Sequence, residues 1–164
     1  MTSILKVSEI QDPTNSNTAL TIDSSGNIAT GGRIDAGTSV YAQGSHSATI
    51  STPSVITFNA NQITSGGCTF EDTNTSIKVP VAGLYMVQYS GLGNTGSGGF
   101  ILGVEKNGVT ISGSLTINQA SNNEGASNNI LVVLQANDKI TFKVFSGASH
   151  GNADYNNFFV LKVG

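Results

Sequence analysis

Cysteine and histidine are scarce in this chain. Its 164 residues include one cysteine, Cys68, and two histidines, His46 and His150. A single cysteine cannot form an internal disulfide or supply a multi-cysteine zinc site. Because Cys68 opens a predicted strand, we expect its thiol to be a small buried apolar group rather than a nucleophile.

Charge is equally sparse. Charged residues make up 10% of the chain, with 7 basic against 10 acidic side chains and a formal net charge of -3. Nucleic-acid binding depends on a clustered basic surface, which this composition does not provide. The longest apolar run, residues 130–134, is far too short to cross a bilayer, and residues 1–13 lack the apolar segment of a secretory signal. We therefore expect no nucleic-acid partner, no membrane insertion and no secretory signal.

Motifs for catalysis or cofactor binding are missing as well. Neither histidine stands at a recognisable spacing from a cysteine, a serine or an acidic residue. The adjacent carboxylates of Glu71 and Asp72 lie at a strand end, where consecutive side chains are expected on opposite faces. The glycine-rich stretch 93–99 lacks the lysine and hydroxyl residue of a phosphate-binding loop. The sequence thus predicts a protein that is not an enzyme and holds no cofactor.

Glycine, asparagine, serine and threonine are abundant, whereas helical periodicity is absent. Twenty glycines and short alternating runs separated by polar turns are typical of an all-β protein. Residues 77–89 show the pattern most clearly, with a strand ending at Pro80, a turn at 81–83 and a second strand rich in aromatic and β-branched residues. Strands are predicted at 54–63, 68–71, 75–80, 84–91, 99–106, 109–117, 128–135, 139–146 and 155–163.

Several of these segments resemble one known family. They are Phe70, VPVAGLYMVQY at 79–89 with its P-x-x-G-x-Y motif, the turn Lys106-Asn107-Gly108, LQANDKITFKV at 134–144 and NNFFVLKV at 156–163. Together they resemble the globular head of complement-type proteins, the C1q-type domain of the tumour-necrosis-factor jelly-roll superfamily. The resemblance covers residues 45–164 and implies a jelly-roll sandwich of about ten antiparallel strands that forms a homotrimer. The sequence departs from the family at Asn137 and Val160, where glycine is usual.

The resemblance and the alternation of apolar residues nominate the core. The family pattern places Tyr85, Val87 and Tyr89 inward. Alternation adds Phe100, Leu102, Val104, Val109, Ile111, Leu115, Ile140, Phe142 and Val144. Residues 130–134 are apolar on both faces, which indicates a second buried surface, most simply a subunit interface. The family's threefold assembly identifies this interface as that of a homotrimer.

Connection lengths distinguish the two ends of such a sandwich. Successive antiparallel strands reverse direction, so consecutive connections alternate between the ends. The short turns at 81–83, 107–108 and 136–138 then fall at one end, and the long connections 93–98, 118–127 and 147–154 fall at the other. The carboxyl terminus is expected at the end of the short turns.

The long connections are the candidate binding surface, because loops held by a rigid sandwich commonly carry function. They offer neutral hydrogen-bonding groups and one aromatic ring, which suits a carbohydrate or a polar protein surface. The candidate contact residues are Asn94, Ser97, Asn122, Asn123, Glu124, His150, Asn152, Asp154 and Tyr155. The alternative is that these loops are solvated connections without a ligand.

The first thirty residues read as a separate module. Strands are predicted at 4–10 and 19–22, and a piece of this size needs partners to be stable. The phrase ILKVSEIQDPTNSNTALTIDSSGNI at 4–28 resembles the virion-proximal opening of bacteriophage tail-fibre proteins. The resemblance implies that residues 1–30 attach the chain to a virion or trimerise it, and the alternative is an arm packed on its own domain. The anchoring candidates are Leu5, Val7, Ile10, Leu20 and Ile22. The Gly- and Ser-rich residues 31–48 are expected to form a neck, which leaves 49–164 as the head.

Both resemblances together predict a bacteriophage virion structural protein. It would be a trimeric short fibre or head decoration, made in the host cytoplasm and exposed on the virion surface, whose tip contacts a glycan or protein of the host cell. The alternatives are a capsid cement protein, a free glycan-binding module and a polysaccharide depolymerase. Some complement-type heads hold calcium near the threefold axis, and Glu124 or Asp154 would be the carboxylates for such an ion. No metal site is assigned.

Overall fold

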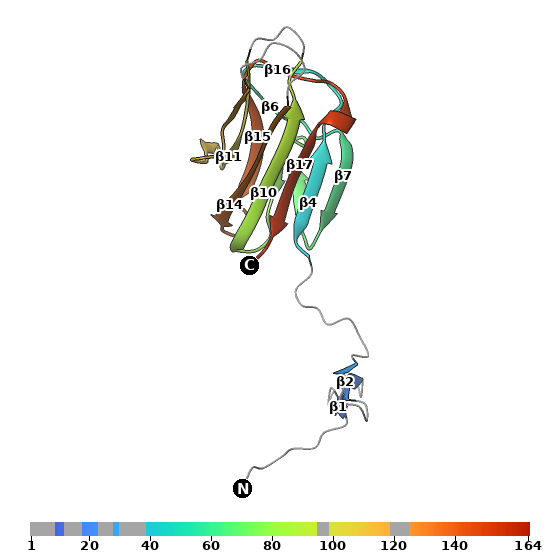
Figure 1. Ribbon diagram of the computed structural model, residues 1–164. Helices are drawn as coiled ribbons and strands as arrows, with labels where there is room; N and C mark the ends of the chain where they lie inside the picture. Colours follow the sequence, from blue (N-terminus) through green and yellow to red (C-terminus); the bar gives the residue numbers. More distant parts are fainter. Residues whose placement is uncertain (1–8, 12–17, 23–27, 30–38, 95–98, 119–124) are drawn as a thin grey trace. The chain divides into compact units, whose positions relative to one another are not determined.

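The chain divides into two compact units. The computed structural model describes residues 9–11, 18–22, 28–29, 39–94, 99–118 and 125–164. One unit spans Met1–Gly37 and the other Thr38–Gly164 (Figure 1). The head therefore starts earlier than residue 49, because the segment expected to be a neck contains the strand β4 (Tyr41–Ser45). The small inward residues of β4 hid it: a Cβ at Gly44 would lie 2.9 Å from Cδ1 of Phe58, so this position accepts only glycine.

The first unit holds a three-stranded antiparallel sheet. Its strands are β1 (Glu9–Gln11), β2 (Thr18–Ile22) and β3 (Ile28–Ala29), in the order β1-β2-β3. Ile10 is opposite Leu20, and Ile22 is opposite Ile28. The predicted anchoring residues Leu5 and Val7 lie outside the described residues. β2 agrees with the strand predicted at 19–22. β1 overlaps the strand predicted at 4–10 at residues 9 and 10, and residues 4–8 of that prediction lie outside the described residues.

The head is a sandwich of two antiparallel sheets (Figure 1). The five-stranded sheet has the order β14-β10-β17-β4-β7. Its strands besides β4 are β7 (Ala60–Ser65), β10 (Gly83–Leu92), β14 (Gly125–Leu134) and β17 (Asn157–Lys162). This sheet places β10 in the interior, where it pairs with β14 along its whole length and with β17 from Tyr85 to Ser90.

The second sheet has seven strands. Its main path is β12-β11-β15-β9-β8, with β13 beside β11 and β6 beside β15. The strands are β6 (Ser54–Val55), β8 (Thr69–Glu71), β9 (Ser76–Lys78), β11 (Phe100–Lys106), β12 (Val109–Thr110), β13 (Thr116–Asn118) and β15 (Lys139–Ser146). A short ribbon of β5 (Ile50–Ser51) and β16 (Ala148–Ser149) and a 3-10 turn, η1 (Ala153–Tyr155), complete the described elements. The prediction of an all-β jelly roll is confirmed.

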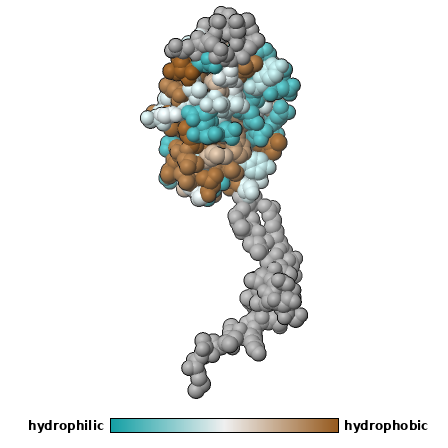
Figure 2. Space-filling model, viewed as in Figure 1, coloured by the Kyte–Doolittle hydropathy of each residue, from teal (hydrophilic) through white to brown (hydrophobic). Residues whose placement is uncertain are grey.

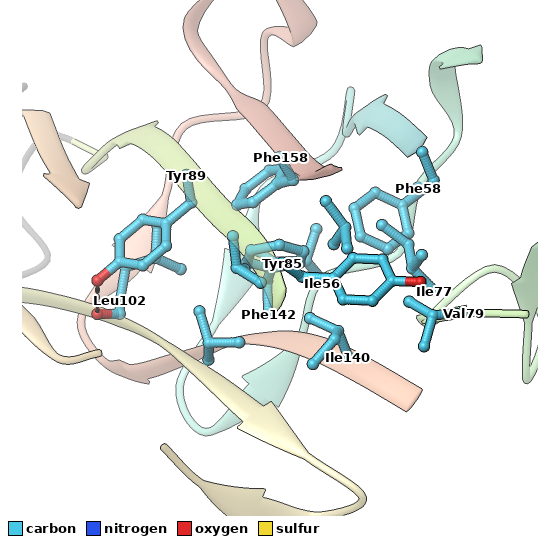
Figure 3. Close-up of a cluster of buried hydrophobic side chains, with 14 of the residues drawn as sticks. Ile56, Phe58, Ile77, Val79, Tyr85, Tyr89, Leu102, Ile140, Phe142 and Phe158 are labelled. Atoms are coloured by element: carbon cyan, nitrogen blue, oxygen red, sulfur yellow. Dashed lines mark hydrogen bonds between the residues drawn. The ribbon is translucent and has the colours of Figure 1, made fainter. Parts of the chain in front are cut away.

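The core lies between the sheets and is aromatic at its centre (Figure 3). Phe142 packs against Phe158 with ring centroids 5.0 Å apart, and Phe58 and Tyr89 meet Phe142 edge-on. Cys68 is a free, buried thiol, and burial raises its pKa to about 11, so it is an apolar core group as expected. Nine predicted core residues are buried, namely Tyr85, Val87, Tyr89, Phe100, Leu102, Val104, Ile140, Phe142 and Val144.

The prediction was wrong for Val109 and Leu115, which are 70% and 47% exposed. The segment 109–117 is two short strands rather than one, because Gly113 adopts a φ of 77° and turns the chain. After this turn Ser114 takes the inward position, where its hydroxyl bonds to both the N–H and the carbonyl of Val104 at 3.1 Å. Ile111 is partly buried against the core as predicted. The stretch 54–63 is likewise broken, between β6 and β7.

Tyr89 supplies the hydrogen bonds that join the two sheets inside the core. Its hydroxyl lies 3.1 Å from the carbonyl of Leu102 and 2.8 Å from Oγ1 of Thr116, and it also contacts the carbonyl of Ser114 (Figure 3). Tyr85 is equally buried, but its hydroxyl has a single partner, the carbonyl of Val81 at 2.7 Å. Val81 lies in an exposed turn, so water can replace this bond.

Replacing these two tyrosines by phenylalanine therefore has unequal effects. We expect Tyr89→Phe to lower the free energy of unfolding by about 1–3 kcal/mol, because it leaves buried polar groups without partners. Tyr85→Phe is the matched control and should cost less, roughly 0.5–1.5 kcal/mol. Urea denaturation monitored by circular dichroism measures both. An equal or larger loss for Tyr85→Phe would contradict this account of the core.

Candidate functional site

The long connections gather at one end of the head, which we call the tip. β10 and β14 pair so that Leu92 is opposite Gly125, which brings the ends of two connections together. The third connection joins them, because Gly93 bridges to Ser149 and the N–H of Asn94 donates to the carbonyl of Ala148 at 2.8 Å. The alternation argument from connection lengths is therefore correct for the described residues.

The opposite end, which we call the base, holds both termini of the head. The N–H of Lys162 donates to the carbonyl of Val40 at 2.8 Å, and the N–H of Leu84 donates to the carbonyl of Gly164 at 2.9 Å. The Asn107-Gly108 turn is also here, with φ values of 51° and 81° that suit a two-residue hairpin. The head thus enters and leaves at the base, which leaves the tip free of chain ends.

Five of the predicted tip residues are described, and the structure brings them to this end. They are Asn94, His150, Asn152, Asp154 and Tyr155. Ser97, Asn122, Asn123 and Glu124 lie outside the described residues. Tyr155 is 51% exposed, and its ring packs edge-on against His150 with centroids 5.1 Å apart. The described tip therefore presents the Tyr155 ring among hydrogen-bonding groups that are neutral apart from the exposed carboxylate of Asp154.

Short-range hydrogen bonds fix the conformation around Tyr155. The side-chain oxygen of Asn152 accepts from the N–H of Asp154 at 3.0 Å and so caps η1. The N–H of Asn152 donates to Nδ1 of His150 at 3.2 Å, which makes the neutral imidazole the acceptor. The carboxylate of Asp154 stays exposed.

Asn156 is a buried clamp that the sequence did not single out. Its amide nitrogen donates to the carbonyls of His150 and Asn152 at 2.9 and 2.8 Å, and its oxygen accepts from the N–H of Leu92 at 3.3 Å. Only 2% of the residue is exposed. Asn156 thus ties the third connection to the end of β10. Nothing in a loop rich in asparagine distinguishes this one from its exposed neighbours.

A shallow hollow of about 330 Å³ lies beside Tyr155. It is lined by residues 90–92 of β10, residues 125–127 of β14 and Tyr155 itself. Small side chains form most of its floor, so the tyrosine ring is the largest group available to a ligand. The arrangement can hold a flat, partly polar group by stacking and hydrogen bonding.

His46 lies buried beneath the tip, although the sequence placed it in a neck. It is fully buried, with its ring centroid 5.8 Å from that of Phe158. Burial lowers the pKa of His46 below its ordinary value of 6.5, and His150 adds to this effect, whereas the Ala48 carbonyl and Asn156 oppose it. The sequence did not indicate this burial, because the strand that precedes His46, β4, was not predicted.

Clusters of side chains that could hold a metal ion are absent from the part of the chain that the structure describes. No group of three or more His, Cys, Asp or Glu side chains lies together there. The ion pairs of the described residues all lie on the seven-stranded sheet or at the base, for example Lys139 with Asp72 at 2.8 Å and Lys143 with Glu105 at 2.8 Å. The hydrogen bond from Lys139 lowers the pKa of the Asp72 carboxyl. Among the same residues, no helix has the length and apolarity to cross a bilayer.

The strand order and the two packed sheets define a jelly-roll head. Residues 39–160 match the C1q domain family, and the chain belongs to it. None of the curated proteins compared with the chain matches it.

Two solved structures are similar to the head. The globular domain of zebrafish complement 1qA superposes with a TM-score of 0.58 at 13% identity, covering 76% of this chain and 98% of that one. Murine APRIL superposes with a TM-score of 0.60 at 15% identity, covering 77% and 99%. At these identities the likeness concerns the fold alone.

Removing the Asn156 clamp should loosen the tip selectively. We expect Asn156→Leu, which keeps a similar volume but makes no hydrogen bond, to lower stability by roughly 1–3 kcal/mol. Because the lost bonds hold residues 150–152, amide hydrogen exchange there should rise more than in β15. Asn157→Leu is the control, since Asn157 is exposed at the adjacent position. Equal exchange in both variants would show that Asn156 does not act as the clamp.

Proposed function

We propose that this chain is a bacteriophage virion structural protein, a short fibre or decoration whose trimeric head presents an adhesive tip to the host cell. The observation that carries the proposal is the separation of the head's two ends. Chain entry and exit, tight turns and the ion pairs of the described residues lie at the base or on the seven-stranded sheet. The described tip is instead a free end of polar loops around Tyr155, with Asp154 as its charged group. A protein mounted by its amino-terminal side and contacting a surface by its far end has this layout.

The outer face of the five-stranded sheet supports a trimer. C1q- and tumour-necrosis-factor-like domains typically form homotrimers. On this face Leu84 is opposite Val133, and Met86 lies between Leu131 and Leu161. Leu131 and Val133 are 66% and 61% exposed, which is unusual for paired aliphatic residues. Figure 2 shows the resulting apolar patch on the part of the head nearest the base.

The same face becomes polar toward the tip. The next outward cross-strand pairs are Gln88 with Asn129 and Ser90 with Ser127. An apolar contact between subunits would therefore be strongest near the base and weaken toward the tip. Such an interface would join the subunits while the tip loops stay available to a ligand.

The amino-terminal module supplies the proposed link to the virion. Residues 4–28 resemble the virion-proximal segment of tail-fibre proteins, and β1 to β3 form a sheet too small to be stable alone. On these strands Ile10 is paired with Leu20, and Ile22 is paired with Ile28. The proposed role of the module is attachment to other virion proteins, assisted by trimerisation.

A charge on the apolar face should break the trimer. We expect Leu131→Asp to convert a trimer into monomers in size-exclusion chromatography with light scattering, because three carboxylates would be buried without partners. Val109→Asp is the matched control, since Val109 is 70% exposed on β12 of the other sheet and should remain trimeric. A wild-type monomer, or a trimer that tolerates Leu131→Asp, would rule out this interface.

The adhesive role is tested with the soluble full-length protein as a competitor of phage adsorption. We expect the wild-type protein to block adsorption, and Tyr155→Ala to lose at least tenfold in blocking potency, which corresponds to about 1.4 kcal/mol. Val109→Ala is the control away from the tip. A protein that sits at the symmetry axes of the capsid and does not compete would instead be a capsid cement protein.

A further inference from the structure

The two histidines of the chain lie on two segments that pack together at the underside of the tip. His46 follows β4, and the segment 46–49 that it begins packs directly on residues 150–152. A Cβ at Gly151 would lie 2.8 Å from the backbone nitrogen of Thr49, so the two segments touch without room for a side chain. The β5–β16 ribbon and a bond from the N–H of Ile50 to Oγ of Ser149 at 3.2 Å join them further.

His46 is held in its neutral form by its surroundings. Its Nδ1 lies 2.8 Å from the carbonyl oxygen of Ala48, which can only accept, so Nδ1 carries the proton. Nε2 is then a bare acceptor, and it has no hydrogen-bond partner among the described residues. Asn156 lies near the ring, but its amide nitrogen is committed to the carbonyls of His150 and Asn152. A second proton on His46 would therefore place a charge on a buried ring, a cost that hydrogen bonding to the Asn156 side chain offsets only in part.

His150 is held in place by hydrogen bonds to its neighbours. Its Nδ1 accepts the backbone N–H of Asn152 at 3.2 Å. The backbone N–H of His150 donates to the carbonyl of Leu92 at 2.7 Å, which joins the residue to the end of β10.

The described charges near this pair give a proton no compensation. The groups that act on His46 are the Ala48 carbonyl, the Asn156 side chain and His150, and none of them is a carboxylate. Tyr155 packs on His150 from η1, and the Asp154 carboxylate on the same turn is exposed. His150 itself lowers the pKa of His46 further, because like charges repel.

We propose that His46 is an acid-sensitive latch that, while its imidazole is neutral, holds the connection 147–156 against the segment 46–49. Protonation of the latch releases residues 150–152 and the Tyr155 ring beside them. The latch stands on its own geometry, and its consequence, weaker adhesion at acid pH, rests on the proposed function.

The direction of the pH effect follows from linkage. Because the folded head lowers the pKa of His46, the unfolded chain binds more protons as the pH falls below 6.5. The contribution of the neutral ring to stability is complete above pH 6.5. It is lost progressively as the pH falls from there toward the lower pKa of the folded state. The carboxyl groups of Asp72 and Asp138 do not interfere, because their pKa values are lowered and they are protonated only below about pH 4.

The test uses the full-length protein alone, between pH 7.5 and 5.0. The chain has two histidines, so comparison with His150→Asn assigns the two imidazole C–H signals. NMR titration of the assigned signal then gives the pKa of His46. We expect the His46 pKa to lie below 6.5. Exchange protection at residues 148–152, corrected for intrinsic exchange rates, should fall about tenfold for each pKa unit of depression, while β15 stays protected. A His46 pKa at or above 6.5 with unchanged protection would overturn the latch.

Variants separate the latch from general acid instability. His46→Phe fills the site without a titratable group and should abolish the pH dependence of exchange at 148–152. His150→Asn keeps an oxygen acceptor for the Asn152 N–H and should weaken the dependence. Gly151→Ala should open the latch even at neutral pH, whereas Gly125→Ala, whose nearest contact would be at 3.8 Å, should not. An unchanged acid response in His46→Phe would refute the proposal, and if this variant does not fold, the wild-type titration decides.

Binding to host cells at pH 7.5 and 5.5 then tests the consequence. With the latch confirmed by exchange, adhesion that weakens in acid in the wild type and not in His46→Phe supports its role at the tip. A protein with a working latch that binds no host cell at either pH contradicts the proposed function and leaves the latch intact.

Discussion

The structure depends on one strand that is paired on both sides and used on both faces. β10 is bonded to β14 and β17, so all its backbone groups over residues 85–90 lie in a ladder, and its alternation must serve two surfaces. Its inward residues meet the aromatic core, whereas its outward residues form the centre of the exposed sheet. Shifting this strand by one residue would exchange the two faces completely. The register of β10 therefore sets both the interior of the head and the surface proposed for assembly.

Much of the fold could be predicted because long strands carry their burial pattern in the sequence. The inward residues of β10, β11 and β15 were predicted from alternation and family pattern, and the tip was located from connection lengths alone. The errors occurred where a backbone turn or a tertiary contact overrode local pattern. Gly113 reversed the alternation before Leu115, and β4 was missed because Ala42 and Gly44 leave space for Phe58 rather than filling it.

The exposed residues of the site could be predicted from the sequence, whereas the buried residues that fix their conformation could not. Exposed residues such as Tyr155 could be nominated because a long polar loop at the free end of a sandwich has few aromatic groups. Asn156 and His46 could not be nominated, because their roles depend on contacts between distant parts of the chain. Asn156 and its partner Leu92, for example, are 64 residues apart. A residue that stabilises a loop from below looks in sequence like any other polar residue of the loop.

The distribution of charge gives the tip its particular character. Ion pairs on the seven-stranded sheet and at the base tie strands and turns together, for example Lys139 with both Glu71 and Asp72, whereas the described tip is held by amide, carbonyl and imidazole groups. Neutral hydrogen bonds do not weaken with ionic strength as exposed ion pairs do, so the tip should keep its shape in salt. Among the described residues, none of the groups that act on His46 is a carboxylate that could balance a proton there. A tip built to be insensitive to salt is, for that reason, sensitive to acid.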